Sequence, residues 1–116
     1  MMHYEGGCQC GAVRYGVEAE IAEVMSCNCS RCQKLGWLLT FVTPDHFRLL
    51  KGEGATTVFK FNKHVINHHF CSTCGIQSFA VGTGPGGQRM VAVNVRCLDG
   101  FDLDAVPIKK VDGRSF

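Results

Sequence analysis

Apolar and polar residues alternate with a period of two in several stretches of the chain, the pattern of half-buried β-strands. Residues 37–42 are instead a continuous apolar run rich in β-formers, which is typical of a buried strand. The Gly- and Pro-rich stretch 82–87 lies between two of these segments, and we interpret it as a hairpin turn. The predicted strands cover residues 12–18, 37–42, 56–61, 66–70, 77–81 and 90–95.

Helical periodicity is weak along the whole chain. One short helix is predicted over residues 30–35, and a turn is predicted near residues 44–46. A chain of 116 residues is the length of one domain, and it contains no internal linker or low-complexity tract. We therefore expect a single, mainly β domain over residues 1–116.

Charge and hydropathy exclude several classes of function. Twelve Lys and Arg residues stand against ten Asp and Glu residues, and the net charge of +2 gives no electrostatic footprint for nucleic acid. No basic cluster suggests an anionic membrane, and no apolar run approaches the roughly 20 residues that span a bilayer. Residues 1–7 lack the pattern of a signal peptide. The sequence therefore predicts a cytoplasmic protein without a nucleic-acid or membrane partner.

Eight cysteines change this picture, because they are clustered. In a reducing compartment, clustered cysteines are more often metal ligands than disulfides. A tetrahedral ion also needs several sulfurs at about 2.3 Å from one point, which local clustering supplies. The four groups are Cys8-Gln9-Cys10, Cys27-Asn28-Cys29-Ser30-Arg31-Cys32, Cys71-Ser72-Thr73-Cys74 and a lone Cys97.

Each spacing has a geometric reason. In Cys8-x-Cys10 an extended backbone directs both side chains to the same face, and in Cys71-x-x-Cys74 a tight turn brings the sulfurs together. A glycine follows each pair, where it tolerates a positive φ and lets backbone N–H groups approach the sulfurs. Thiolates select zinc over magnesium or calcium, with iron–sulfur chemistry as the main competitor.

Counting the ligands divides the cysteines into two sites. The first and third groups together supply four sulfurs, enough for a closed structural zinc site. The second group supplies three, and a zinc ion with three protein ligands and an open position is typical of catalysis or ligand binding. Alternatively, Cys97 or a histidine closes the second site, which would leave two structural ions and no chemistry. Two zinc ions per chain are expected in either case.

The ordered cysteine motifs resemble those of the glutathione-dependent formaldehyde-activating enzyme family, which includes centromere protein V. The resemblance rests on Gly-x-Cys-x-Cys-Gly at residues 6–11, on the Cys-x-Cys-x-x-Cys motif about 20 residues later, and on residues 70–76. Residues 93–100 and 112–116 are similar too, so the resemblance covers essentially the whole chain. It implies a β-tent of antiparallel sheets with very little helix.

The resemblance also implies residue roles. The structural zinc falls on Cys8, Cys10, Cys71 and Cys74, and the catalytic zinc falls on Cys27, Cys29 and Cys32. The implied activity is that of a carbon–sulfur lyase, which adds a small thiol such as glutathione to formaldehyde, or reverses that addition. An ion with an open position would bind the incoming thiol as a thiolate, since coordination lowers a thiol pKa.

Several nearby residues are candidates for supporting roles. Arg31 and Lys34 could attract a substrate carboxylate or offset local negative charge, and Trp37 could form a pocket wall or part of the core. Three further candidates for ligand or acid–base roles are His64, His68 and His69. In an alternating strand His68 and His69 face opposite sides, so they cannot both bind one ion.

Cys97 stands apart from the three clusters and admits other interpretations. It is either a buried thiol at a strand end or the fourth ligand of the second zinc. A third hypothesis compares it with B-type methionine sulfoxide reductases, which share this general fold and carry a nucleophilic cysteine late in the chain. A non-enzymatic alternative for the whole protein is a zinc-stapled binding module.

Overall fold

Ten strands and one α-helix make up most of the structure, a computed structural model that describes residues 1–60, 66–84 and 86–115. Three single-turn 3-10 helices lie in the connections between strands, and a fourth follows the last strand. The strands are β1 (Met2–Gly7), β2 (Arg14–Ala19), β3 (Val24–Cys27), β4 (Leu39–Val42), β5 (Phe47–Lys51), β6 (Thr56–Phe59), β7 (Ile66–Cys71), β8 (Gln77–Thr83), β9 (Arg89–Asn94) and β10 (Ile108–Val111). The helices are α1 (Ser30–Leu35), η1 (Pro44–His46), η2 (Val95–Cys97), η3 (Leu103–Ala105) and η4 (Gly113–Ser115).

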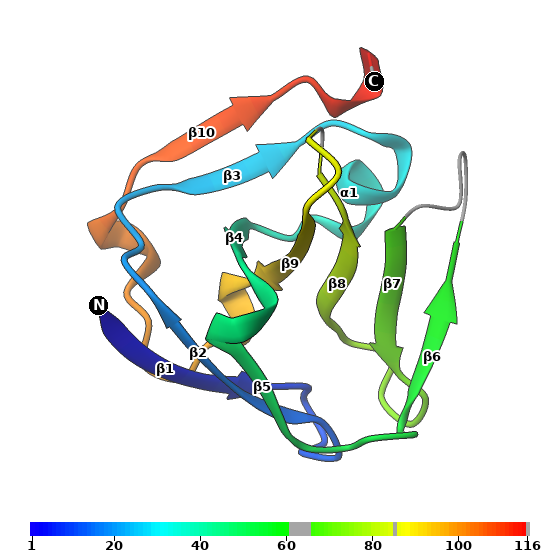
Figure 1. Cartoon of the computed structure of the whole chain (residues 1–116). Coiled ribbons are helices and arrows are strands. Elements are labelled where there is room, and N and C mark those ends of the chain that lie inside the picture. The colour runs from blue at the N-terminus through cyan, green and yellow to red at the C-terminus, as the bar shows by residue number, and fades with distance from the viewer. Residues whose placement is uncertain (61–65, 85, 116) are drawn as a thin grey trace.

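The strands form two sheets. The smaller has the order β1-β2-β5, and the larger has the order β10-β3-β4-β9-β8-β7-β6. In Figure 1 the larger sheet bends from β10 and β3 at the top to β7 and β6 at the right, while β1, β2 and β5 lie below. The fold is therefore mainly β with two sheets and few helices, as the sequence predicts.

One strand pair departs from the antiparallel arrangement that we expected. β10 runs parallel to β3, with Ile108 beside Val24 and Val111 beside Cys27. The connection from β9 to β10 covers residues 95–107, which is long enough for the crossover that a parallel neighbour requires. This pairing brings the C-terminal segment alongside the second cysteine motif.

The core fills the space between the two sheets. Val91 and Val93 of β9 are buried in it, whereas the intervening Ala92 belongs to a second apolar cluster. Tyr15 of β2 is completely buried and packs against Phe47 and Phe79, with ring centroids 5.1 and 6.0 Å away. Aromatic pairs of this kind contribute about 0.5–1.5 kcal/mol each beyond the area they bury. The alternation in β9 thus gives the larger sheet two apolar faces.

The helices are short, and two of them, α1 and η1, match the prediction, whereas η2, η3 and η4 were not predicted. α1 covers Ser30–Leu35, and η1 occupies the predicted turn. The Cys29 side chain caps the first turn of α1, and Gly36 ends the helix in the left-handed conformation at φ 73°. Within the part of the chain that the structure describes, no helix is long and apolar enough to cross a membrane.

Each of the six predicted strands corresponds to a strand in the structure, and four strands were not predicted: β1, β3, β5 and β10. The stretch 82–87 is a hairpin connection, since Thr83 pairs with Arg89 and the Gly84 N–H donates to the Gln88 carbonyl. Pro85 in that stretch, Phe61 at the end of a predicted strand, and the candidate His64 lie outside the described residues.

Candidate metal centres

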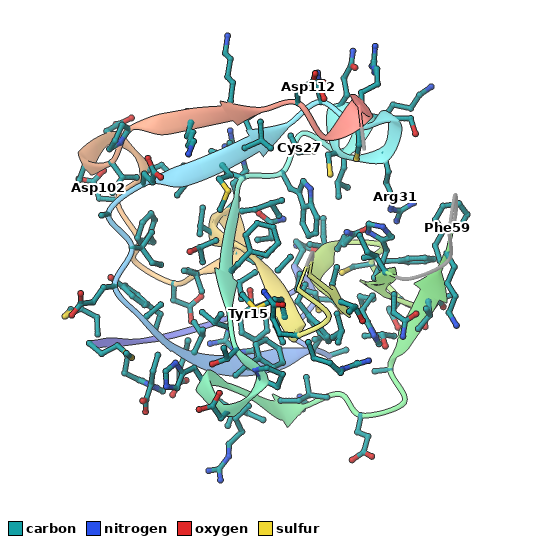
Figure 2. The ribbon with its side chains drawn as sticks, turned by 45° about the horizontal axis from the view of Figure 1, so that its top comes forward. Tyr15, Cys27, Arg31, Phe59, Asp102 and Asp112 are labelled. Carbon is teal, nitrogen blue, oxygen red and sulfur yellow. The ribbon has the colours of Figure 1, made fainter. Side chains whose placement is uncertain are left out.

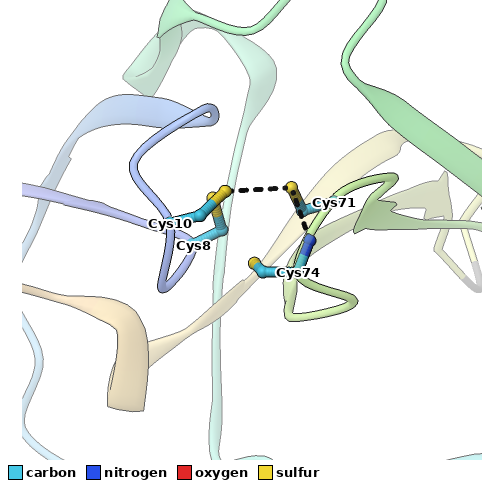
Figure 3. A group of neighbouring side chains, drawn as sticks. All are labelled: Cys8, Cys10, Cys71 and Cys74. Atoms are coloured by element: carbon cyan, nitrogen blue, oxygen red, sulfur yellow. Dashed lines mark hydrogen bonds between the residues drawn. The ribbon is translucent and has the colours of Figure 1, made fainter.

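The first and third cysteine groups meet at the junction of the two sheets. Cys8 and Cys10 follow β1 of the smaller sheet, whereas Cys71 ends β7 of the larger sheet and Cys74 lies in the turn after it. Figure 3 shows the two loops facing each other with all four sulfurs directed into the space between them. These sulfurs lie within 4.8 Å of one another, so the quartet could hold a metal ion.

The sulfur spacing in this quartet fits a tetrahedral ion. The Sγ atoms of Cys8 and Cys10 are 3.7 Å apart, and those of Cys10 and Cys71 are 3.6 Å apart. Four sulfurs at about 2.3 Å from a central zinc would be separated by about 3.8 Å. A disulfide would require about 2.05 Å. The donor set and its spacing are therefore those of a sulfur-coordinated metal centre, and all eight cysteines are free thiols.

Backbone N–H groups surround the quartet. The Cys8 Sγ accepts from the Val13 N–H at 3.3 Å, and the Cys71 Sγ accepts from the N–H groups of Thr73 and Cys74 at 3.4 Å. These donors favour thiolates. The Cys74 and Thr73 amides lower the pKa of Cys71, and the Ile76 amide lowers the pKa of Cys74 to about 6. The loops that carry the ligands are thus built to hold negatively charged sulfur.

The two glycines after the cysteine pairs shape these loops as predicted. Gly11 has a φ of 83° and Gly75 a φ of 81°, values in the left-handed region that favours glycine. The Gly75 N–H also closes the Cys71–Cys74 turn by donating to the Cys71 carbonyl at 2.9 Å. The conformational demand of each turn therefore explains the residue type.

The second group gathers at the junction of β3 and α1. Cys27 ends β3, Cys29 caps α1, and Cys32 lies buried in the first turn of the helix. Their sulfurs also lie within 4.8 Å of one another. No fourth Cys, His, Asp or Glu joins them among residues 1–60, 66–84 and 86–115. We call these three residues the triad, and it too could hold a metal ion.

Local hydrogen bonds orient the triad. The Cys29 Sγ accepts from the Cys32 N–H at 3.3 Å, and the Cys27 Sγ accepts from the Cys29 N–H at 3.5 Å. Burial raises the pKa of Cys29, but hydrogen bonds from Cys32 and Cys27 lower it below its ordinary value. Burial raises the pKa of Cys32. The two shifts have opposite directions, so Cys29 loses its proton more readily than the buried Cys32.

The C-terminal segment is fastened to the triad through Asn28. The Asn28 backbone N–H donates to the Val111 carbonyl at 3.2 Å, and the Asn28 side-chain amide donates to Asp112 Oδ1 at 2.9 Å. The Arg114 N–H returns a hydrogen bond to Asn28 Oδ1 at 3.0 Å, and its guanidinium donates to Gln33. Because Asn28 lies between two triad cysteines, these bonds fix the segment against the loop that carries the triad.

Gly113 makes the closest approach of this segment to the sulfurs. A Cβ atom at this position would collide with the Sγ of Cys27 and come within 3.7 Å of the Cys29 Cβ. The φ of Gly113 is not in the left-handed region, so the requirement for glycine is one of space alone. Sequence reasoning missed this residue as part of the site, although the resemblance includes residues 112–116.

A cavity of about 390 Å³ opens beside the triad, between β3, α1 and β10. This is the size of a small-molecule site. Its lining is partly polar and includes the two triad residues Cys27 and Cys32. The other lining residues are Ser26, Asn28, Gln33, Gly36, Lys110, Val111 and Asp112.

Arg31 projects from α1 toward the hairpin of β6 and β7, as Figure 2 shows. Its guanidinium lies 4.6 Å from the ring centroid of Phe59 and donates to Gln77 Oε1 from Nε at 3.0 Å and from a terminal nitrogen at 2.7 Å. Among the described residues, no salt bridge joins Arg31 to an acidic side chain. The Arg31 guanidinium is therefore held in place by Gln77 and Phe59.

Gln77 links Arg31 to His68 through hydrogen bonds to both side chains. Because Gln77 Oε1 accepts from Arg31, its Nε2 faces His68 Nδ1 at 3.1 Å and donates to it. The His68 proton then resides on Nε2. Burial, with the charge of Arg31, lowers the pKa of His68 to about 4, so the ring is neutral at neutral pH. Gln77 was not among the predicted site residues.

The other residues that the sequence analysis named as candidates lie in different environments. His69 faces away from His68, as predicted: its ring stacks on Phe79 at 4.7 Å and its Nδ1 contacts Thr56 Oγ1 at 3.1 Å. Neither histidine belongs to a cysteine cluster among the described residues. Trp37 is buried in the second apolar cluster with Cys32, which makes it both a core residue and a wall beside the triad. Lys34 is exposed in the last turn of α1.

Cys97 lies in η2, outside both clusters. Burial raises its pKa to about 11, and the neighbouring thiols of Cys8 and Cys74 contribute to that shift. It therefore lies near the quartet, and the structure does not support the alternative in which Cys97 closes the second site. A raised pKa is also the opposite of what a nucleophilic thiol requires.

Two sheets, few helices and two sulfur clusters define a cysteine-rich β protein with two candidate metal centres. The family model described as glutathione-dependent formaldehyde-activating enzyme matches residues 3–111, and the chain belongs to that family. The structure is also similar to a crystal structure of a Rhodobacter sphaeroides protein, with a TM-score of 0.78 and 30% sequence identity. That match covers 90% of this chain and 99% of the other.

Proposed function

We propose that residues 1–116 form one zinc-binding β-tent domain that acts in the cytoplasm as a carbon–sulfur lyase. In this proposal Cys8, Cys10, Cys71 and Cys74 hold a structural zinc ion that joins the two sheets. The triad Cys27, Cys29 and Cys32 holds a second, catalytic zinc ion. The substrates are a small thiol such as glutathione and a small aldehyde, formaldehyde in the first place. The observation that carries the proposal is the division of the sulfurs into a quartet and a triad.

The reaction joins the thiol sulfur to the carbonyl carbon. The carbon–sulfur bond forms as the C=O π pair moves to oxygen, which takes the proton that the thiol gave up; the reverse reaction retraces these steps. A zinc ion with one open position supplies a site that lowers the pKa of a bound thiol. Holding the two small reactants side by side contributes through proximity.

The residues around the triad fit this chemistry. The partly polar cavity beside Cys27 and Cys32 suits a polar thiol such as glutathione, with Lys110 on its wall to bind a carboxylate. Arg31 is held by Gln77 and Phe59, so its positive charge stays on the side of α1 that faces β6 and β7 without a loss of side-chain freedom on binding. Trp37 keeps water from the buried side of the triad.

An exchange experiment tests the proposed activity. The zinc-loaded protein should accelerate the exchange of ¹³C-formaldehyde with its glutathione adduct, measured by NMR against the uncatalysed rate. Cys29→Ser, which removes a triad sulfur, should abolish the acceleration. Cys97→Ser should keep it, because Cys97 belongs to neither cluster.

Two results would favour the alternatives. A folded, two-zinc protein without any acceleration would favour a zinc-stapled binding module. Loss of activity in Cys97→Ser, together with reduction of methionine sulfoxide by the unmodified protein, would favour the reductase hypothesis.

A further inference from the structure

Trp37 is the single tryptophan of the chain, and it follows the turn that ends α1. Gly36 adopts the left-handed conformation at φ 73° in this turn, and its N–H donates to the Cys32 carbonyl at 2.9 Å. The next residue, Trp37, packs in one apolar cluster with Cys32. A turn that favours glycine therefore places the indole beside a residue of the triad.

The indole N–H of Trp37 is buried away from the usual acceptors. The residue is 4% exposed, and among the described residues no oxygen or nitrogen atom accepts from Nε1. The His68 ring lies 6.3 Å away between centroids, but its Nδ1 accepts from Gln77, so its Nε2 carries the proton and is itself a donor. A buried donor without any partner is costly, so the position of this N–H requires an explanation.

Sulfur is the acceptor that the surroundings of Trp37 supply. Apart from Cys32, the other buried members of its cluster have hydrocarbon side chains, and the partly buried residues packed against the cluster all carry sulfur: Met25, Cys27 and Cys29. Burial raises the pKa of Cys32, and a hydrogen bond from Trp37 acts in the opposite direction. A thiol sulfur is a weak acceptor, whereas a thiolate is a strong one. The contact therefore strengthens when Cys32 is ionised.

Each of the other two triad sulfurs already has an N–H donor. The Cys27 Sγ accepts from the Cys29 N–H at 3.5 Å, and the Cys29 Sγ accepts from the Cys32 N–H at 3.3 Å. In the part of the chain that the structure describes, the Cys32 Sγ accepts from no backbone N–H. A donor from Trp37 would therefore complete a set of one N–H group for each sulfur.

We propose that the Trp37 indole N–H donates a hydrogen bond to the Cys32 thiolate when the triad holds a metal ion, which makes Trp37 a positioning residue of that site. This inference rests on the proposed function, because it requires an ion at the triad. Three thiolates outweigh the double charge of zinc, and a substrate thiolate would add a fourth negative charge. A fixed N–H donor on the buried side offsets part of this charge and favours the bound thiolate.

The hydrogen bond can be observed directly in the cadmium-loaded protein. The indole proton should show a scalar coupling to ¹¹³Cd through the Cys32 sulfur, and a single tryptophan gives a single indole N–H resonance. The coupled cadmium resonance should be the one that Cys29→Ser removes. An indole proton that shows no coupling to this cadmium would overturn the inference. The measurement needs no substitution of Trp37, so it holds even if a Trp37 variant fails to fold.

Trp37→Phe keeps an aromatic ring at this position and removes the donor. The affinity of the triad for zinc should fall about ten- to hundredfold, because loss of a hydrogen-bond partner of a metal ligand has effects of this size. Competition with a chelator measures it.

Tyr15→Phe is the matched control, since it also removes the polar atom of a buried ring. The Tyr15 hydroxyl donates to the Ser78 carbonyl at 3.3 Å within the other core cluster. This variant should therefore keep the zinc affinity of the triad. Equal losses of affinity in Trp37→Phe and Tyr15→Phe would overturn the inference.

These results are separable from those on the proposed function, because the coupling requires a metal ion at the triad but no substrate. A protein that shows the coupling without accelerating formaldehyde exchange would overturn the proposed activity and leave the role of Trp37 in place. An active protein without the coupling would overturn the role of Trp37 alone. A triad that takes up no cadmium would overturn both.

Discussion

The two clusters are both made of cysteine sulfurs, but they differ in how far apart along the chain their cysteines lie. The quartet draws its sulfurs from both sheets and from residues more than sixty positions apart in the chain, with Cys10 beside Cys71. The triad draws all three sulfurs from one short stretch at the junction of β3 and α1. An ion in the quartet would connect distant parts of the fold, whereas an ion in the triad would connect residues that are already neighbours.

We therefore expect the quartet to contribute to the stability of the fold and the triad to its reactivity. Binding free energy at the quartet is available for folding, because the site exists only when the two sheets meet. The triad can lose its ion without separating any elements, since α1 holds Cys29 and Cys32 through its own hydrogen bonds. A site with this freedom is suited to binding and releasing an external ligand.

The largest contrast should appear between matched serine substitutions. Cys74→Ser removes one ligand of the quartet and should prevent folding, since domains of this size are stable by only about 5–15 kcal/mol and a structural zinc site supplies a comparable amount. Cys29→Ser should retain the fold and one zinc ion. Circular dichroism and metal analysis of the two purified variants measure the difference. Loss of both ions in both variants would contradict the division.

A smaller effect, confined to the triad, is expected from Gly113→Ala. The added methyl group collides with the Cys27 sulfur, and relief of such overlap typically costs about 1–3 kcal/mol. The triad should therefore bind zinc about 5- to 150-fold more weakly, as measured by competition with a chelator, while the quartet and the unfolding temperature change little.

Gly84→Ala is the matched control for this substitution. The three atoms nearest to its added methyl group all belong to Gln88, which is in neither cluster. An equal loss of zinc affinity in both variants would show that contact between the tail and Cys27 does not position the triad.

The smallest effect concerns pH and His68. Its folded-state pKa of about 4 lies below the ordinary value, so between about pH 6.5 and pH 4 the unfolded chain binds a proton that the folded chain does not. The free energy of unfolding should fall as pH is lowered through this window. His68→Gln removes that contribution, and denaturant titrations of both proteins at pH 7 and pH 5 should show a shallower pH dependence in the variant. Parallel slopes would contradict the assignment of a neutral His68.

The sequence predicted both clusters because their chemistry is local. The spacings in Cys8-x-Cys10, Cys71-x-x-Cys74 and the Cys27–Cys32 motif bring sulfurs together through the geometry of one strand or one turn. That the first two pairs form one site also follows from the ligand count. Their approach to within 4.8 Å confirms the grouping, although not the identity of any ion.

Residues that reach the triad through the fold could not be found in this way. Gln77 and Phe59 approach Arg31 only because β6, β7 and β8 are neighbours in the larger sheet, and Gly113 approaches Cys27 only through the parallel pairing of β10 with β3. Three of the four strands that were missed have a related cause. β1, β5 and β10 are edge strands, and β5 and β10 are largely exposed, so their sequences lack a clear apolar alternation.

Substitution of ¹¹³Cd for zinc tests the division of the sulfurs most directly, because each cadmium site gives its own NMR resonance. We expect two resonances of equal intensity, and titration with glutathione should shift only the one that Cys29→Ser removes. A single resonance, or two that both remain unchanged when the thiol is added, would contradict a closed quartet beside an open triad.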